Sequence, residues 1–400
     1  MAADYLKLID ERRVREVLAD LVRIPSVNPG FPGGHGEKEV AAYVTRFFER
    51  LGLPVDVQTV EPDRDNVIGT MAGSADLHLL WEAHMDTVQT SGMTVDPFGA
   101  EVRDGKLYGR GACDTKASLA AMLVALETMA ERRLVPAATI HLAAVVDEEI
   151  TYKGVSALAE RIRRGELRCD AAIVGEPTQL HAIIAHKGVL RFRIEVTGAA
   201  AHSSTPEKGV NAIECMADVI AYLKRYAGER FAAQRHPLTG PPTLCISRIE
   251  GGVAPNTVAE RCSISVDIRT APGQEWEDVW TDVRERLAGL EPELPAGATI
   301  TVHRPFLTDY AMEVAPDDPL VLAVMEAANA YAPDRQAIGA PYCSDASKLT
   351  RVSVPTLVFG PGDIAEAHTA GEWVELAEVV RAAAVFVHTA MHFAGRAEQE

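Results

Sequence analysis

Residues 77–86 read LHLLWEAHMD, seven mostly apolar residues followed by a histidine and an aspartate that one residue separates. Such a short apolar run is typical of a strand buried on both faces, as in a parallel sheet. Three further runs have the same form, at 139–146 (TIHLAAVV), 171–175 (AAIVG) and 355–359 (PTLVF), and a long helix is predicted at 116–132. Strands that alternate with helices predict an α/β fold whose mostly parallel sheet is covered by helices.

The pattern changes near residue 187. The segment GVLRFRIEVTG alternates apolar and polar residues, as a half-exposed strand does. After it we expect a helix at 209–228, the strands TLCISRIEG and CSISVDIRT, a helix at about 274–289 and the strand ATITVHRPF. The order β-α-β-β-α-β is that of a ferredoxin-like α+β unit. We therefore expect this unit to occupy 187–306, as an insertion into a first domain that comprises 1–186 and 307–400.

The chain has 400 residues and a formal net charge of −18, with 47% hydrophobic and 24% charged residues. This length suggests two domains, and the acidic balance argues against nucleic acid or an anionic membrane as partner. The N-terminus, where a helix is predicted at 4–22, is charged throughout and unlike a signal peptide. A second helix is predicted at about 36–51. Six cysteines without short paired spacing suit a reducing compartment, so we expect a cytoplasmic protein.

Polar side chains follow the predicted strands at the point where each strand ends. His84 and Asp86 follow the first strand, Asp147-Glu148-Glu149 the second, Glu176 the third and, a few residues later, His368 the fourth. In an open α/β sheet the ligand crevice lies beyond the carboxyl ends of the strands, so these residues should converge there. Asp114, in the turn GRGACDTKAS before helix 116–132, belongs to the same edge.

Clustered carboxylates need a cation to neutralise them, and histidine with carboxylate suits Zn, Co or Mn. Five ligands are too many for one open zinc site but fit two metals that share one carboxylate, and Asp114 is the natural bridge because it stands alone on a turn. The candidate ligands are His84, Asp114, Glu149, Glu176 and His368.

Glu148 is then left without a metal to bind. It can take a proton from a water and transfer it to a leaving amine, which makes it the candidate general base. Asp86 lies two residues from His84, so the two side chains point the same way on an extended segment. Its expected role is to accept the second imidazole N–H and to orient the ring.

Six stretches carry a resemblance to a known family: HMDTV at 84–88, GRGACDTKAS at 109–118, DEE at 147–149, VGEPT at 174–178, GAAAHSSTPEKGVNAI at 198–213 and GPGDIAEAHTAGEWV at 360–374. They resemble the co-catalytic metallopeptidases that include acetylornithine deacetylase, succinyl-diaminopimelate desuccinylase, aminoacylase and carboxypeptidase G. The match runs from about residue 15 to 380, in the order and spacing of that family. Within the family, AHKG at 185–188 together with GPGDIAEAH looks most similar to the acetylornithine deacetylase branch.

The resemblance implies a division of the ligands and further site residues. It implies one metal on His84, Asp114 and Glu176, and a second on Asp114, Glu149 and His368, with zinc as the usual ion. It implies that the inserted domain is a lid and dimerisation domain, so that the protein is a homodimer. His202 resembles a histidine that reaches the neighbouring subunit's site to stabilise an oxyanion. Arg269 and Asn256 resemble residues that hold the substrate carboxylate and nearby polar groups.

The function that these patterns favour is a metal-dependent hydrolase of N-acyl amino acids, with N-acetylornithine as first candidate. The same water could serve a dipeptidase or carboxypeptidase, and the sequence leaves that choice open. Tyr342-Cys343-Ser344-Asp345 departs from the family's usual small residues, as does ITYKG after DEE, so the pocket wall can differ. A metal-bound protein without catalysis would lack Glu148 or a ligand, and a cysteine hydrolase built on Cys113 would need His84 as its base.

Overall fold

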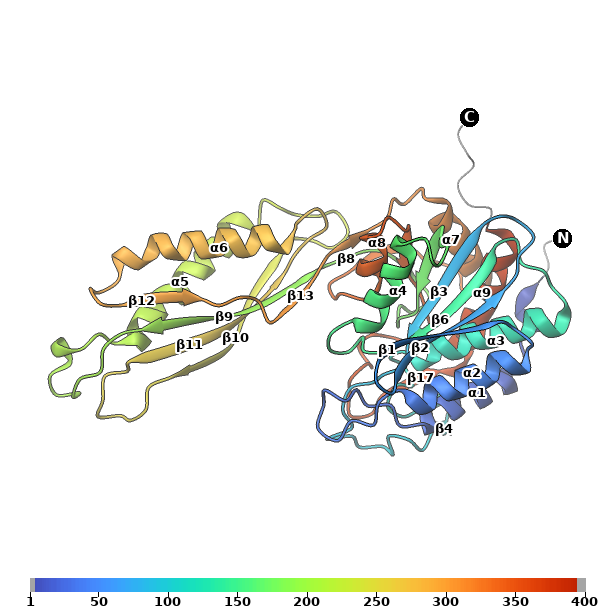
Figure 1. Ribbon diagram of the computed structural model, residues 1–400, viewed down its shortest axis with the longest axis horizontal. Coiled ribbons are helices and arrows are strands. Elements are labelled where there is room, and N and C mark those ends of the chain that lie inside the picture. The colour runs from blue at the N-terminus through green and yellow to red at the C-terminus, as the bar shows by residue number, and fades with distance from the viewer. Residues whose placement is uncertain (1–3, 394–400) are drawn as a thin grey trace. The chain divides into compact units, whose positions relative to one another are not determined.

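The computed structural model describes residues 4–393, which divide into two compact units (Figure 1). The first unit contains the chain up to Ile184, Glu313–Ile338 and the chain from Ser344 onward. The second contains Ala185–Met312 and Gly339–Cys343. The short segment 339–343 lies between two parts of the first unit along the chain but packs with the second. The Lys187 N–H donates to the Ala340 carbonyl at 3.2 Å and holds this segment there.

The first unit is built on a nine-stranded sheet. Along the sheet the strands are β1 (Val55–Glu61), β2 (Arg64–Met71), β6 (Thr139–Val145), β3 (His78–His84), β7 (Ala171–Val174), β16 (Thr356–Val358), β8 (Ala182–His186) and β14 (Met312–Glu313), and β15 (Ala337–Ala340) pairs with β8. The central four, β6, β3, β7 and β16, are parallel, and they are the four strands that the sequence predicts. The mostly parallel sheet is therefore confirmed.

On one side of these four, β2 pairs antiparallel with β6 and β1 with β2, and on the other side β8 pairs antiparallel with β16. β1 and β2 form a hairpin that turns at Asp63, whose φ of 62° lies in the left-handed region that aspartate tolerates. β1 was missed in the sequence because it lies at the edge of the sheet, where four of its seven residues are polar and none is fully buried.

Helices cover both faces of this sheet. They are α1 (Glu11–Arg23), α2 (Lys38–Arg50), α3 (Lys116–Arg132), α4 (Lys153–Arg163), α7 (Pro319–Tyr331), α8 (Ala346–Thr350) and α9 (Leu376–His392). Alternate residues of β3, Leu79, Trp81 and Ala83, join α1, α2, α3, α7 and α9 in one core. The predicted helix 116–132 is α3, which is buried over most of its length. None of the described helices combines the length and the apolarity that a membrane crossing needs.

The prediction of one continuous N-terminal helix at 4–22 is wrong. The chain forms a short 3₁₀ helix, η1 (Tyr5–Leu8), and then starts again as α1. Asp10 separates the two, because its side chain accepts the backbone N–H of Arg12 at 2.9 Å and so caps a new helix. The amphipathic pattern continues across the break and conceals it.

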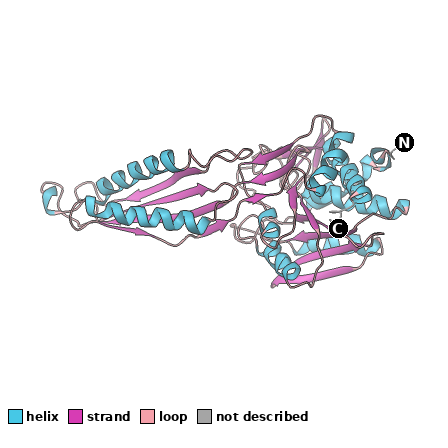
Figure 2. Cartoon of the chain, turned by 90° about the horizontal axis from the view of Figure 1, so that it is seen from above, coloured by secondary structure: helices cyan, strands magenta, loops and turns pink. Residues whose placement is uncertain are grey.

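The second unit has the predicted β-α-β-β-α-β order, with two helices running along its strands (Figure 2). The elements are β9 (Val189–Thr197), η2 (Pro206–Lys208), α5 (Ala212–Arg230), β10 (Thr243–Gly251), β11 (Arg261–Arg269), α6 (Trp276–Leu290), η3 (Glu291–Glu293), β12 (Thr299–Val302) and β13 (Leu307–Asp309). The antiparallel strand order β10-β11-β9-β12 is that of a ferredoxin-like sheet. Alternate residues of β9 and β11 pack against α5 and α6 in a separate core.

A small three-stranded sheet joins two distant parts of the first unit. It consists of β4 (Glu101–Arg103), β5 (Lys106–Tyr108) and β17 (Trp373–Glu375), with β5 in the middle. Trp373 pairs with Tyr108 and Val374 with Leu107. The segment just before the Asp114 turn is thereby fixed to the segment just after His368.

Candidate metal centre

The carboxyl ends of the central parallel strands bring the predicted polar residues together. His84 is the last residue of β3, and Asp147-Glu148-Glu149 begin two residues after the end of β6. Glu176 lies two residues after β7, and His368 lies ten residues after β16. Because β6, β3, β7 and β16 are neighbours and parallel, these side chains meet at one edge.

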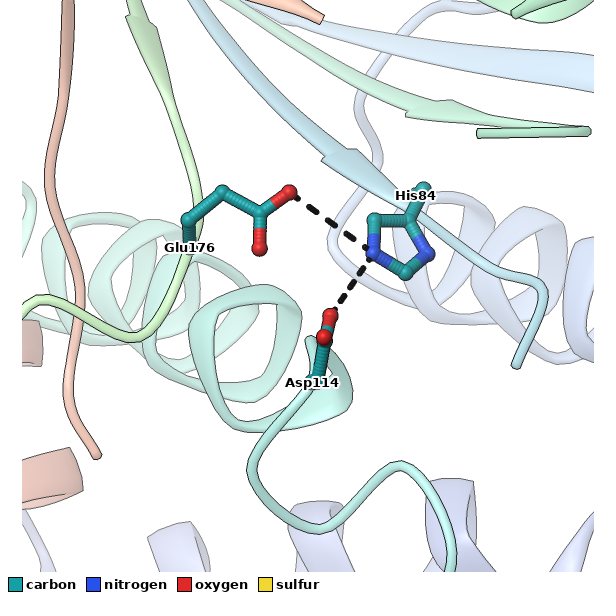
Figure 3. Close-up of side chains that lie close together, drawn as sticks. All are labelled: His84, Asp114 and Glu176. Carbon is teal, nitrogen blue, oxygen red and sulfur yellow. Dashed lines mark hydrogen bonds and ion pairs between the residues drawn. The ribbon is translucent and has the colours of Figure 1, made fainter. Parts of the chain in front are cut away.

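His84, Asp114 and Glu176 form the first cluster (Figure 3). The His84 Nε2 atom lies 3.0 Å from Asp114 Oδ1 and 3.8 Å from Glu176 Oε1. All three side chains are buried. A nitrogen and two carboxylate oxygens that point at one another are the donors of a small divalent-cation site.

Asp114, Glu149 and His368 form a second cluster. The His368 Nε2 atom lies 3.1 Å from Asp114 Oδ2 and 3.2 Å from Glu149 Oε1. Asp114 thus presents Oδ1 to one histidine and Oδ2 to the other. The two clusters share this carboxylate, which is the geometry of a bridging ligand.

The electrostatics of the histidines reflect the surrounding carboxylates. Burial alone would lower the pKa of His368, but hydrogen bonds to Asp114 and Glu149 outweigh it and raise the pKa to about 11. For His84, burial is likewise outweighed by hydrogen bonds to Asp114 and Asp86, which raise its pKa well above the usual value. Burial acts to raise the pKa of Asp114. Hydrogen bonds to His368 and His84 outweigh burial and hold this pKa far below the usual range.

The other carboxylates lie close together, with too little positive charge nearby to neutralise them. Burial raises the pKa of Glu149 to about 7. Burial, followed by the charge of Asp114, raises the pKa of Glu176 well above its usual value. Carboxylates in this state are stabilised as anions by a bound dication. The two N,O donor sets therefore fit two divalent cations.

Asp86 contacts His84 through its main chain as well as through its carboxylate. The hydrogen bond of His84 Nδ1 at 2.9 Å is to the backbone carbonyl of Asp86, and the carboxylate Oδ1 lies 3.6 Å away. The carboxylate also accepts two backbone N–H groups, from Glu148 and Glu149, each at 3.1 Å. Asp86 thereby orients the ring through its main chain and supports the turn that carries Glu148.

A buried network that sequence reasoning missed lies behind this turn. The Asn28 amide donates to Asp86 Oδ2 at 2.7 Å and to Asp147 Oδ1 at 2.9 Å. Arg64 donates to the same Asp147 oxygen at 3.1 Å and to Glu37 Oε2 at 2.9 Å. Asn28 stands in a proline- and glycine-rich loop, and no period or spacing marks it.

A further pair of buried carboxylates lies close to the clusters. Burial, followed by the charge of Asp345, raises the pKa of Glu82 well above its usual value. Burial also raises the pKa of Asp345 to about 7. Two such groups side by side hold a proton more readily than two negative charges. The sequence marked Asp345 only as part of a pocket wall.

Three predicted site residues belong to the second unit. His202 is exposed, and its Nδ1 lies 2.7 Å from Ser204 Oγ. His202 pairs with Thr257, and the Asn256 carbonyl accepts the Ser203 N–H at 3.0 Å, so His202 and Asn256 lie on adjacent segments. Arg269 is the last residue of β11, where its Nε donates to Asp267 Oδ1 at 2.9 Å.

Cys113 is the residue next to the bridging aspartate. Its thiol is buried and donates to the Asp363 carbonyl at 3.3 Å. Burial, followed by the charges of Glu372 and Asp114, raises the pKa of this thiol well above its usual value. A thiol held protonated in this way is a poor nucleophile.

Comparison with known proteins agrees with this architecture. The family model described as Peptidase family M20/M25/M40 matches residues 80–392. The acetylornithine deacetylase of Proteus mirabilis (strain HI4320) is 32% identical over 370 residues, which cover 90% of this chain and 92% of that protein. The acidic clusters, the sheet and these matches define a metal-dependent amidohydrolase. The chain belongs to Peptidase family M20/M25/M40.

Two solved structures share the fold. A tripeptidase from Staphylococcus aureus has a TM-score of 0.78 and 23% identity, with 96% of this chain and 98% of that chain covered. A dinuclear metal binding peptidase of the M20 family from Bacillus subtilis has a TM-score of 0.70 and 18% identity, with 95% of this chain and 97% of that chain covered. At these identities the likeness establishes the fold alone.

We expect metal uptake to release protons. Without cations, His368, with a pKa of about 11, is protonated at neutral pH, and Glu149, with a pKa of about 7, is partly protonated. Both must be deprotonated to bind a cation, so the affinity for Zn²⁺ should rise with pH from about pH 6, and it should still be rising at pH 8 because His368 holds its proton there. Calorimetric titration in two buffers of different ionisation enthalpy measures the protons released. An affinity independent of pH, with no proton released, would contradict the assignment of these ligands.

Proposed function

We propose that this enzyme hydrolyses the amide bond of small N-acyl amino acids, with N-acetylornithine as the first candidate. The observation that carries the proposal is the arrangement around Asp114, with two donor clusters that share one carboxylate and Glu148 beside them. The similarity to a protein named acetylornithine deacetylase, over 90% of this chain, supports the choice of substrate class.

Glu148 is the residue that we propose as general base. Its backbone N–H is held by Asp86, and it belongs to neither donor cluster. Burial raises the pKa of its carboxyl group well above the usual value, opposed by the charge of His84 and assisted by that of Asp345. A carboxylate whose pKa lies closer to neutral can both accept and return a proton.

Two divalent cations, when bound, supply Lewis acidity for the scissile carbonyl and lower the pKa of water. His84, Asp114 and Glu176 would hold one cation, and Asp114, Glu149 and His368 the other. Glu148 takes a proton from the attacking water and passes it to the nitrogen of the leaving amine. Imidazole with carboxylate favours Zn²⁺ as the native ion, with Co²⁺ or Mn²⁺ as alternatives.

We propose that Arg269 binds the substrate carboxylate, with Asn256 on nearby polar groups. The Arg269 guanidinium is held by Asp267, which also accepts from Arg191 at 2.6 Å, so its position is fixed. A planar guanidinium suits a carboxylate because it can donate two parallel hydrogen bonds.

We propose that His202 serves the site of a second subunit and stabilises the oxyanion there. Arg269 ends β11, whereas His202 lies against Thr257, just before β11 begins at Arg261. Nine residues of strand place these two ends about 26 Å apart. One copy of the second unit therefore does not bring both side chains to a single reacting carbonyl, but two copies in a dimer can.

The second unit also has a surface for such a dimer. β10 is an edge strand of nine residues, and the exposed side chains along and beside it include Ile249 at 56% and Val253 at 91%. Open edges with apolar side chains favour pairing with another chain. We propose a homodimer through this unit, and the cytoplasm as the compartment in which the enzyme works.

Hydrolysis of a substrate panel by the Zn²⁺- and Co²⁺-loaded enzyme tests the proposed activity. The panel contains N-acetylornithine, N-succinyl-diaminopimelate, other N-acetyl amino acids and several dipeptides. We expect kcat/KM to be highest for an N-acyl amino acid. A preference for dipeptides would overturn the deacylase proposal in favour of a dipeptidase that uses the same centre. If no compound in the panel is hydrolysed, the proposed substrate class is wrong.

Glu148→Gln should retain both cations but lower kcat by at least about 10²-fold, because the amide cannot accept the proton. Metal content is measured by elemental analysis and turnover by release of the free amino acid. The control is Glu131→Gln, the same substitution at an exposed glutamate of the same unit, which should keep full activity. Normal turnover of Glu148→Gln would remove Glu148 as the base.

His202→Ala should lower kcat by about 10²-fold or more with both cations retained, the usual cost of removing one oxyanion donor. A mixed dimer of His202→Ala with Glu148→Gln then tests whether His202 acts across subunits. One of its two sites would combine an intact Glu148 with the partner's His202, so activity should reappear on mixing. Two inactive variants that stay inactive after verified subunit exchange would place His202 in its own subunit's site or outside the reaction.

A further inference from the structure

The bridging role of Asp114 demands a carboxylate that cannot rotate. Its Oδ1 lies 3.0 Å from His84 Nε2 and its Oδ2 lies 3.1 Å from His368 Nε2, so a modest turn of the side chain would spoil both clusters. We propose that two buried side chains, Thr115 and Glu372, hold Asp114 from opposite sides, one for each cluster. This inference rests on the two-metal centre of the proposed function.

Glu372 forms the tether to the second cluster. Its side chain is completely buried, and Oε1 accepts the backbone N–H groups of Cys113 at 2.9 Å and Asp114 at 3.1 Å. Glu372 lies four residues after His368, in the loop that enters β17. A single carboxylate oxygen therefore connects the main chain of Asp114 to the segment that carries His368.

Arg110 makes this tether rigid. It donates to Glu372 Oε2 at 2.5 Å and to the Thr369 carbonyl at 3.4 Å, and it is only 3% exposed. The ion pair neutralises Glu372, which would otherwise add a negative charge next to Asp114. The pairing of β17 with β5 ties the same two segments together through the main chain. Glu372 and Arg110 are positioning residues, since neither belongs to a donor cluster.

Thr115 forms the tether to the first cluster. Its hydroxyl donates to the Gly175 carbonyl at 2.7 Å, and the side chain is completely buried. Gly175 directly precedes Glu176, and its N–H donates to the Glu82 carbonyl at 2.8 Å, two residues before His84. One hydroxyl thus fixes the residue after Asp114 to the strand ends that carry the other two ligands of the first cluster.

The two tethers should tune the two cation sites unequally. Side chains that orient metal ligands typically change metal affinity about 10–100-fold when they are replaced. Loss of the bond from Thr115 to Gly175 frees the residue next to Asp114 and should weaken the His84 cluster more. Loss of the Glu372 bonds separates Asp114 from the His368 loop and should weaken the His368 cluster more.

Titration with Co²⁺ alone tests this assignment, with each cluster studied in isolation. His368→Ala disables the second cluster and Glu176→Ala the first, so each background reports one affinity. In the His368→Ala background, Thr115→Val should weaken Co²⁺ binding by about 10-fold or more, and by at least about 3-fold more than Glu372→Met does. In the Glu176→Ala background the order should reverse. Equal losses in both backgrounds, or no loss in either, would overturn the proposal.

Two further variants separate positioning from folding. Glu127→Gln breaks a buried ion pair of the same unit, in which Arg13 Nε lies 2.8 Å from Glu127 Oε2, and it should leave Co²⁺ affinity unchanged. Arg110→Lys keeps the charge beside Glu372 but loses the reach to Thr369, and it replaces Glu372→Met should that variant fail to fold. An equal loss of affinity in Glu127→Gln would make the effect a general loss of stability.

Failure of this inference and failure of the proposed function give different results. Co²⁺ binding needs no substrate, so the tethers can be tested even where the substrate panel is silent. A wild-type chain that binds two cations, with variants that show no asymmetry, overturns the tethers alone. A wild-type chain that binds a single cation overturns the two-metal centre, and the tethers with it.

Discussion

The shared carboxylate of Asp114 is the constraint on which the rest of this structure depends. One oxygen faces the histidine at the end of β3 and the other faces a histidine from a loop ten residues beyond β16. The parallel sheet brings the strand ends to one edge, and the small β4-β5-β17 sheet fixes the loop of His368 beside the Asp114 turn. The turn is tied on one side to Gly175 and on the other to Glu372.

The concentration of negative charge explains why so many buried side chains surround Asp114. Burial raises the pKa of Glu148, Glu149 and Glu176, which is the cost of gathering carboxylates away from water. Two dications would offset that cost, whereas Asp86 and Asp147 are stabilised by hydrogen bonds from Asn28 and from the backbone of the Glu148 turn. Cations would thus stabilise the candidate ligands, whereas hydrogen bonds stabilise the residues that support them.

The sequence predicted what periodicity and strand ends encode. The four central strands, the helix 116–132 and the ferredoxin-like order follow from apolar patterns, and the structure places the five candidate ligands in two clusters. The roles of Asn28, Thr115 and Glu372 could not be predicted in this way. Their hydrogen bonds join segments far apart in the chain and produce no periodic pattern in the sequence. The split of the first helix at Asp10 was missed for a different reason, because one local capping hydrogen bond decides it and leaves the amphipathic pattern unchanged.

The central claim is that one aspartate joins two cation sites. Anomalous X-ray diffraction from crystals of the Zn²⁺-loaded enzyme, combined with elemental analysis of the same sample, tests it most directly. We predict two cations per chain, about 3.5–4 Å apart, with one oxygen of Asp114 on each. A single cation per chain, or two cations that do not share Asp114, would contradict the account.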